Sequence, residues 1–214
     1  MPARRTPSHA LALLVRHGRT PTTGAVLPGR APGLHLADDG RAQAEAAAAR
    51  IASLKRPPAA VYASPLERAV ETARPIAAAL GLRVRVERGL LECDFGSWTG
   101  QKLGTLRRKR EWKTVISMPS AFRFPGGESF AEMQVRMSST LDRLAERHGG
   151  GSFVAVSHAD PIKAAVADTA GVPLDLFQRL VVGPCSVTAL VRGGEARTVL
   201  CVNALSSLAE LGLS

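Results

Sequence analysis

The sequence predicts an α/β fold, a three-layer sandwich in which a mainly parallel central sheet is flanked by helices. Short apolar runs alternate along the chain with longer, alanine-rich segments of helical character, as in repeated strand–helix units. The first of these runs, at residues 10–15, is apolar throughout, which is typical of a strand that is buried on both faces of a sheet. The chain has 214 residues, of which 45% are hydrophobic, so it is long enough to bury one large core.

The first quarter of the chain predicts two strands and one helix. Residues 10–15 form a short apolar run that ends in charge and glycine, as a buried strand does. Residues 21–33 are rich in Pro and Gly and are predicted to be a loop. Residues 38–54 contain alanine throughout and begin with Asp38, which predicts a helix. Residues 59–63 are a second short apolar run and predict the next strand.

The sequence Ser-Pro-Leu-Glu at residues 64–67 is typical of a helix start. We expect the Ser to cap the helix, the Pro to take the first helical position and the Glu to complete a capping box. The helix should run to about Leu80 and stop at Gly81. Residues 82–86 predict a third strand, and residues 90–104 show no regular pattern.

The second half of the chain repeats the alternation of strands and helices. Ser129 and Glu132 predict a capping box for a helix that ends near His148. The remaining predicted elements are a strand at 152–156, a helix at 160–170 and strands at 186–191 and 198–202. No internal repeat or linker interrupts the pattern, so we expect a single domain over residues 1–214.

The charge of the chain is strongly positive. Twenty-eight Lys and Arg residues against 18 Asp and Glu residues give a net charge of +10, which favours nucleic acid, membrane surfaces or phosphorylated metabolites as partners. Residues 10–15 are too few for the apolar part of a signal peptide, and no segment is long enough to span a bilayer. The three cysteines are odd in number and lack metal-like spacing. We therefore expect a cytoplasmic protein without a disulfide framework or membrane attachment.

Cationic side chains follow three of the predicted strands. Arg16 and His17 come directly after the first strand, and His158 follows the strand at 152–156. Arg68 lies in the first turn of the helix that follows residues 59–63. Ligands of open α/β sheets bind beyond the carboxyl ends of strands, so these side chains are expected to converge. The helix dipole disfavours a cation at Arg68, which therefore needs a compensating anion, either a ligand or a carboxylate such as Glu71.

Four segments, taken in chain order, resemble the motifs of the histidine phosphatase superfamily in its phosphoglycerate mutase-like branch. They are residues 14–20 (Leu-Val-Arg-His-Gly-Arg-Thr), 64–73 (Ser-Pro-Leu-Glu-Arg-Ala-Val-Glu-Thr-Ala), 91–100 (Leu-Glu-Cys-Asp-Phe-Gly-Ser-Trp-Thr-Gly) and 157–159 (Ser-His-Ala). The resemblance implies that His17 attacks phosphorus and becomes a phosphohistidine. It also implies that Arg16, Arg68 and His158 bind the phosphoryl oxygens and spread the charge of the transition state.

The resemblance further implies a proton donor and a set of substrate contacts. Glu92 is the expected general acid and base, with Asp94 as its rival. Many relatives carry Asn at the position of Thr23, so we expect Thr23 and Gly24 to contact the leaving group in a different way. Arg30 lies in a loop that contacts substrate in relatives, and a solvated loop arginine is an equal alternative for it.

The predicted function is therefore that of a phosphoric monoester hydrolase, a phosphatase acting on a small phosphorylated metabolite without metal or cofactor. One alternative is a phosphoglycerate mutase-type phosphotransfer, which typically needs a longer insert than the segment between Gly100 and Gly126. Another is a basic nucleic-acid-binding protein with a vestigial site, although the chain does not interleave aromatic residues with its cations. The sequence leaves the substrate open and allows for a homodimer.

One further feature is a basic segment that directly follows the predicted acid. It comprises residues 102–113 and holds six cations against the single acid Glu111. Arg107, Arg108 and Arg110 are three of those cations. We expect this segment either to steer an anionic substrate or to be a solvated helix face.

Overall fold

The central sheet of the computed structural model has six strands, and the structure describes residues 9–205. The strands are β1 (Ala10–Arg16), β2 (Val61–Ala63), β3 (Val84–Val86), β4 (Ser152–Ser157), β5 (Val187–Gly193) and β6 (Ala196–Ala204). Their order across the sheet is β3-β2-β4-β1-β5-β6. The pairs β2–β3, β2–β4 and β1–β4 are parallel, whereas β5 is antiparallel to both β1 and β6. The prediction of a mainly parallel sheet is therefore confirmed.

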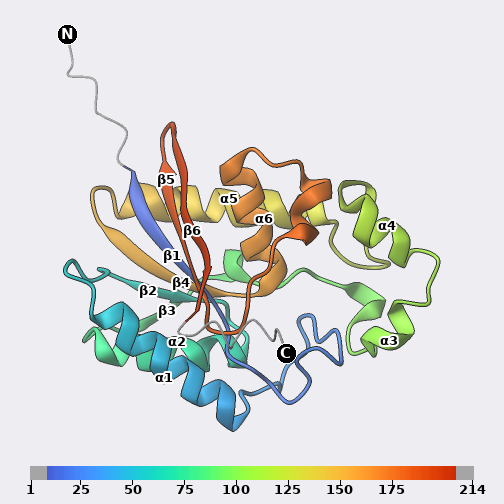
Figure 1. Cartoon of the computed structure of the whole chain (residues 1–214), viewed down its shortest axis with the longest axis horizontal. Helices are drawn as coiled ribbons and strands as arrows, with labels where there is room; N and C mark the ends of the chain where they lie inside the picture. The colour runs from blue at the N-terminus through green and yellow to red at the C-terminus, as the bar shows by residue number, and fades with distance from the viewer. Residues whose placement is uncertain (1–8, 206–214) are drawn as a thin grey trace.

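Helices cover both faces of this sheet, as Figure 1 shows. The long helices are α1 (Asp38–Ala52), α2 (Glu67–Ala79), α5 (Phe130–Arg147) and α6 (Ala159–Ala170). Helices α1 and α2 lie together on one face, and α5 and α6 lie together on the other. The short helices α3 (Leu103–Leu106) and α4 (Trp112–Ser117) lie to one side of the sheet. The predicted three-layer sandwich is confirmed, while the ends of the predicted 1–214 domain lie outside the described residues.

Strand β1 shows why the apolar runs lack polar positions. Ala12 and Leu14 point into the core beneath α5 and α6, whereas Leu13 and Val15 point into the core beneath α1 and α2. All four side chains are buried. Alternate residues of a strand face opposite sides of the sheet, so a strand covered on both sides must be apolar throughout. Burying each of the larger aliphatic side chains contributes about 1.5–3 kcal/mol.

A third core, rich in aromatic residues, supports the segment between β3 and α5. Phe95, Trp98, Phe122, Phe124 and Phe130 are buried together, with neighbouring ring centroids about 5 Å apart. This segment contains only short helices, so packing of the rings rather than a regular backbone pattern fixes its course. The predicted acid Glu92 lies at the start of this segment.

Two predicted helix starts have different outcomes. The capping box of α5 is confirmed, because Ser129 accepts from the backbone N–H of Glu132 and the Glu132 side chain accepts from that of Ser129. The predicted capping box at Ser64 is wrong. Helix α2 begins at Glu67, its N-cap is Leu66 and no side chain caps it. The Ser64 hydroxyl is instead bonded to His158, 2.8 Å away, so a tertiary contact overrides the local signal.

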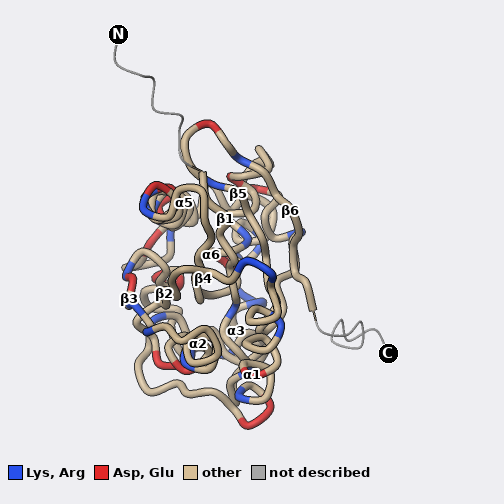
Figure 2. The backbone as a smooth tube through the Cα atoms, turned by 90° about the vertical axis from the view of Figure 1, so that its left-hand side faces the viewer, with Lys and Arg blue, Asp and Glu red and all other residues tan. Residues whose placement is uncertain are grey.

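Basic and acidic residues are interspersed along most of the chain (Figure 2). Within residues 9–205, no helix is long and apolar enough to cross a membrane.

Candidate active site

The carboxyl ends of three neighbouring strands bring the predicted site together. His17 follows β1, and its backbone N–H donates to the carbonyl of Ser157 at the end of β4 (3.0 Å). His158 follows directly, and its ring centroid lies 5.2 Å from that of His17. Ser64 follows β2 and donates its backbone N–H to β4 as well. Parallel pairing of β1, β4 and β2 therefore places both imidazoles at one edge of the sheet.

The ring of His17 is held as a neutral imidazole with one free nitrogen. Its Nδ1 lies 2.8 Å from the carbonyl oxygen of Gly18, a contact that requires Nδ1 to carry the proton. The lone pair is consequently on Nε2. Burial lowers the pKa of His17 well below its usual value, and the nearby charges of Arg68 and Arg16 lower it further. The ring is thus neutral near pH 7, with the Nε2 lone pair available.

Gly18 is required by close packing rather than by backbone conformation. A Cβ at this position would lie 2.5 Å from the carbonyl oxygen of Gly40 at the start of α1. The backbone N–H of Gly18 donates to the Thr72 hydroxyl of α2 at 3.0 Å. Both contacts fix the peptide that holds the His17 ring.

Arg16 and Arg68 supply positive charge at the site, and neither forms an ion pair within the described residues. Arg68 is fully buried and donates one Nη2 bond to the carbonyl of Gly29 (2.8 Å). Arg16 donates from Nη1 to the carbonyl of Val182 (2.8 Å). Among the described residues, Arg16 Nε and Arg68 Nε and Nη1 are buried without a hydrogen-bond partner. Unpaired buried donors of this kind are costly, and an oxyanion would satisfy them.

The carboxylate that could have compensated Arg68 is used elsewhere. Glu71 accepts from the backbone N–H of Leu36 (2.9 Å) and binds His35, so it holds the loop between β1 and α1. His35 itself is exposed. Glu71 is therefore not the anion that compensates Arg68, whose pKa burial lowers and the negative charges of Glu92 and Glu67 raise.

His158 is fully buried between a hydroxyl and a guanidinium. Its Nε2 lies 2.8 Å from Ser64 Oγ, and its Nδ1 lies 3.3 Å from Arg68 Nη2. Burial and the neighbouring charges of Arg68 and His17 lower its pKa well below the usual value. Because a guanidinium can only donate, Arg68 Nη2 donates to Nδ1, and the proton of the neutral ring is on Nε2, which donates to the Ser64 hydroxyl.

Glu92 is the titratable carboxyl of the site. Its side chain is buried, and its Oε1 accepts from the backbone N–H of Cys93 (3.0 Å). Burial raises the pKa of Glu92 to about 7, and the negative charge of Asp160 adds to this rise against the opposing effect of Arg68. A carboxyl with this pKa can both donate and accept a proton at neutral pH.

Asp94, the rival acid, and the predicted substrate contacts Arg30, Thr23 and Gly24 lie in loops of the protein. Asp94 accepts from the N–H of Gly96 and is 41% exposed at its side chain, as expected for a loop-capping residue. Arg30 donates from Nε to the carbonyl of Glu92 (2.8 Å) and from Nη2 to Glu128 (3.0 Å). Thr23 Oγ1 accepts from the backbone N–H of Thr20 (2.9 Å), beside an exposed Gly24 with φ of 81°. Their roles in substrate binding stay predictions.

Sequence reasoning missed several residues of the site. Ser64 was interpreted as a helix cap, and Glu128 and Arg136 were not singled out at all. A local signal for Glu128 is the Gly-Gly-Glu sequence before the capping box of α5. A side chain at Gly127 would clash with the backbone of Asp94, so this glycine marks a close approach to the segment that carries Glu92. Asp160 lies two residues after His158, but the sequence does not indicate that its charge raises the pKa of Glu92, because the fold brings the two carboxyls together.

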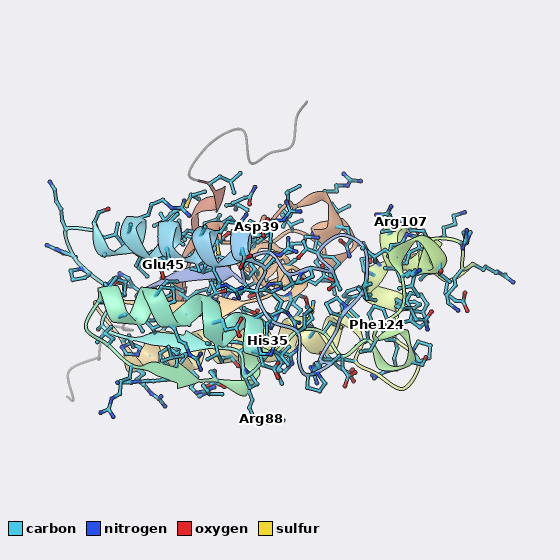
Figure 3. All side chains as sticks on the ribbon, turned by 90° about the horizontal axis from the view of Figure 1, so that it is seen from below. His35, Asp39, Glu45, Arg88, Arg107 and Phe124 are labelled. Carbon is cyan, nitrogen blue, oxygen red and sulfur yellow. The ribbon has the colours of Figure 1, made fainter. Side chains whose placement is uncertain are left out.

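The basic segment is joined at its start to the loop after β1. A bridge between Val26 and Lys102 makes this connection, two residues after Gly24. Arg107 directly follows α3 and lies well away from Glu45 of α1 (Figure 3). The three arginines of this segment are exposed. Within residues 9–205, no group of three or more His, Cys, Asp or Glu side chains could hold a metal ion.

Comparison with known proteins gives consistent matches. The family model described as histidine phosphatase superfamily (branch 1) matches residues 12–205. An uncharacterized protein of Mycobacterium tuberculosis is 37% identical over 159 residues, which cover 73% of this chain and 76% of that protein. Phosphoserine phosphatase 1 of Hydrogenobacter thermophilus is 30% identical over 152 residues, covering 70% and 72%. The solved structure of a mycobacterial glucosyl-3-phosphoglycerate phosphatase is similar with a TM-score of 0.80 at 25% identity, covering 92% of this chain and 100% of that one.

Proposed function

The chain belongs to branch 1 of the histidine phosphatase superfamily, and on this premise we propose that it hydrolyses small phosphomonoesters through a phosphohistidine intermediate on His17. The predicted family and its phosphoglycerate mutase-like fold are confirmed by the matches. The phosphoserine phosphatase and the glucosyl-3-phosphoglycerate phosphatase that the chain resembles support the same reaction class here.

One observation carries the proposal. Three buried guanidinium nitrogens of Arg16 and Arg68 have no partner among the described residues, and they belong to the two arginines whose charges act on the neutral, buried ring of His17. A phosphoryl group in this position would accept hydrogen bonds from those nitrogens. Charge-assisted bonds of this kind are stronger than bonds between neutral groups, and they match the charge that develops on the phosphoryl oxygens.

The reaction then proceeds in two steps. In the first, the Nε2 lone pair of His17 attacks phosphorus, the bond to the ester oxygen breaks, and Glu92 gives its proton to the departing alcohol. In the second, ionised Glu92 takes a proton from water, which attacks the phosphohistidine and releases inorganic phosphate. Each step returns the proton that the other requires, so Glu92 must change its protonation state near the working pH. The raised pKa of Glu92, about 7, supports this role.

His158 and Ser64 hold Arg68 at the phosphoryl site. Arg68 Nη2 donates to Nδ1 of His158 (3.3 Å), and Nε2 of that ring donates to the Ser64 hydroxyl (2.8 Å). These bonds fix the guanidinium whose Nε and Nη1 are left for an oxyanion.

A phosphatase is favoured over a mutase by the short chain segment after the acid. Between Gly100 and Gly126 there are only the short helices α3 and α4 and one turn of 3-10 helix. A mutase must hold a second substrate hydroxyl against the phosphohistidine, whereas a phosphatase needs only water there. The short segment favours attack by water. We propose a small metabolite free in the cytoplasm as substrate, with no metal, nucleic acid or membrane involved.

A panel assay tests this function. Phosphate release is measured with alkyl and aryl phosphomonoesters, including phosphoserine and glucosyl-3-phosphoglycerate, and isomerisation of 3-phosphoglycerate is followed in parallel. We expect phosphate release that survives a chelator and is absent in His17→Ala. Isomerisation faster than release would identify a mutase, and release in the alanine variant at the wild-type rate would rule out His17 as nucleophile.

A further inference from the structure

The backbone that carries Glu92 has no regular secondary structure of its own. Glu92 lies between two single turns of 3-10 helix, Arg88–Leu90 and Gly96–Trp98. Its carboxyl must nevertheless keep one direction, since an acid that is displaced by about 1 Å can lose about 10²-fold in rate. Some other part of the molecule must therefore hold this backbone.

Arg136 of α5 holds it through three main-chain carbonyls. Its Nη1 donates to the carbonyls of Gly89 (2.8 Å) and Leu91 (2.9 Å), and its Nη2 donates to that of Glu92 (3.3 Å). Arg30 adds a second donor to the same Glu92 carbonyl, from Nε at 2.8 Å. The backbone immediately before and at Glu92 is thus bonded to two guanidinium groups.

Glu128 links these two arginines into one unit. Its carboxylate accepts from Arg136 Nε and Nη2, both at 2.8 Å, and from Arg30 Nη2 at 3.0 Å. It also accepts from the backbone N–H of Asp94 (3.2 Å), two residues beyond Glu92. We call Arg30, Glu128 and Arg136 the carbonyl clamp.

The clamp binds the main chain of Glu92 and leaves its carboxyl to the site. Within the described residues, no hydrogen bond joins a clamp residue to the Glu92 carboxyl, whose Oε1 accepts from the Cys93 N–H. Glu128 opposes the charge of the two arginines, and both its partners are largely buried. A guanidinium without this carboxylate would stabilise ionised Glu92, lower its pKa and leave a smaller fraction of it protonated at neutral pH.

We propose that Arg136 and Glu128 are positioning residues for the general acid, acting with Arg30 to fix the direction of Glu92 and to screen it from the clamp's own positive charge. This inference rests on the proposed function. The clamp is not needed to anchor α5, because Phe130, Met133 and Met137 are fully buried and a capping box fixes the start of the helix. Its distinctive contribution is to the segment that carries Glu92.

Two conservative variants and one matched control test the proposal. Arg136→Lys keeps the charge but cannot reach three carbonyls, and Glu128→Gln keeps the shape but removes the countercharge. Arg143→Lys is the control, since Arg143 lies on the same helix and pairs with Glu87 at 2.9 Å, outside the clamp. Single-turnover phosphorylation of His17 is measured with an alkyl and an aryl phosphomonoester, because only the alkyl leaving group depends strongly on protonation.

Both clamp variants should lose up to about 10²-fold with the alkyl ester and clearly less with the aryl ester. Arg143→Lys should match wild type with both. In a Glu92→Gln background, Arg136→Lys should cost little more, since residues acting through one group are not additive. An equal loss with both esters, or a full further loss in that background, overturns the proposal and leaves the clamp a purely structural element.

A readout without catalysis separates this inference from the proposed function. In protein labelled with ¹³C at glutamate carboxyls, the titration midpoint of Glu92 should move to lower pH in Glu128→Gln and stay in place in Arg143→Lys. An unchanged midpoint in Glu128→Gln overturns the screening role even if the wild type proves to be no phosphatase. An inactive wild type with a displaced midpoint overturns only the proposed function.

Discussion

Replacing Glu92 with Gln keeps the size of the side chain and removes the proton that a poor leaving group needs. Burial raises the pKa of Glu92 to about 7, so about half of the molecules carry this proton at pH 7 and about one in a hundred at pH 9. The rate of His17 phosphorylation by an alkyl ester should therefore fall about tenfold per pH unit above 7. Glu92→Gln should cost about 10²–10⁴-fold at pH 6 and should abolish this pH dependence.

The assay is rapid-quench measurement of phosphorylation between pH 5 and 9. His17 adds no acidic limb close to neutrality, because burial lowers its pKa well below the usual value. An aryl ester, whose leaving group needs less protonation, should lose less in Glu92→Gln than an alkyl ester does. Asp160→Asn should move the basic limb to lower pH, since the charge of Asp160 helps to raise the pKa of Glu92. Equal losses for both esters, or a basic limb that survives in Glu92→Gln, would refute this reasoning and point to Asp94.

Three other predictions concern substrate steering, the anion site and packing. Changing the three exposed arginines of the basic segment to Gln should lower kcat/KM for a multiply charged ester and flatten its salt dependence, with kcat nearly unchanged; an unaltered salt slope argues against steering. Vanadate at about 100 times its Kd should stabilise the wild type by about 2.7 kcal/mol, which raises Tm by roughly 5–11 °C. Arg68→Met should lose most of this shift, and full retention would place the anion elsewhere. Gly18→Ala should cost about 1–3 kcal/mol by its clash with Gly40, measured by denaturant unfolding, whereas Gly104→Ala, in open space, should not.

The strands and long helices could be predicted because local pattern and tertiary environment agree there. Residues 10–15 and 153–156 are apolar throughout, and both are covered on two faces in the structure. The helix start at Ser64 could not be read correctly, because its hydroxyl is bonded to His158, 94 residues away in sequence. The predicted strand at 82–86 begins two residues later than expected, since only Val84–Val86 pairs with β2.

The residues of the candidate site likewise fall into those that the local sequence predicts and those that only the fold brings together. Arg16, His17, Arg68 and His158 were predictable because each lies at the end of a strand or shortly after one, and strand ends in a parallel sheet share one edge. The contacts of Arg136 with the carbonyls around Glu92 join residues 44 to 47 positions apart, and no local pattern records them. The unpartnered nitrogens of Arg16 and Arg68 are likewise a property of the fold, and they carry most of the argument for a bound oxyanion.

The central claim is that His17 carries the phosphoryl group during turnover. The direct measurement is to quench the enzyme with a ³²P-labelled phosphomonoester and to locate the label by peptide mapping. We expect phosphate that is labile in acid and stable in base, on the peptide that contains His17, with none in His17→Ala. Label on another residue, or phosphate release by an enzyme that never becomes labelled in the first turnover, would contradict the account.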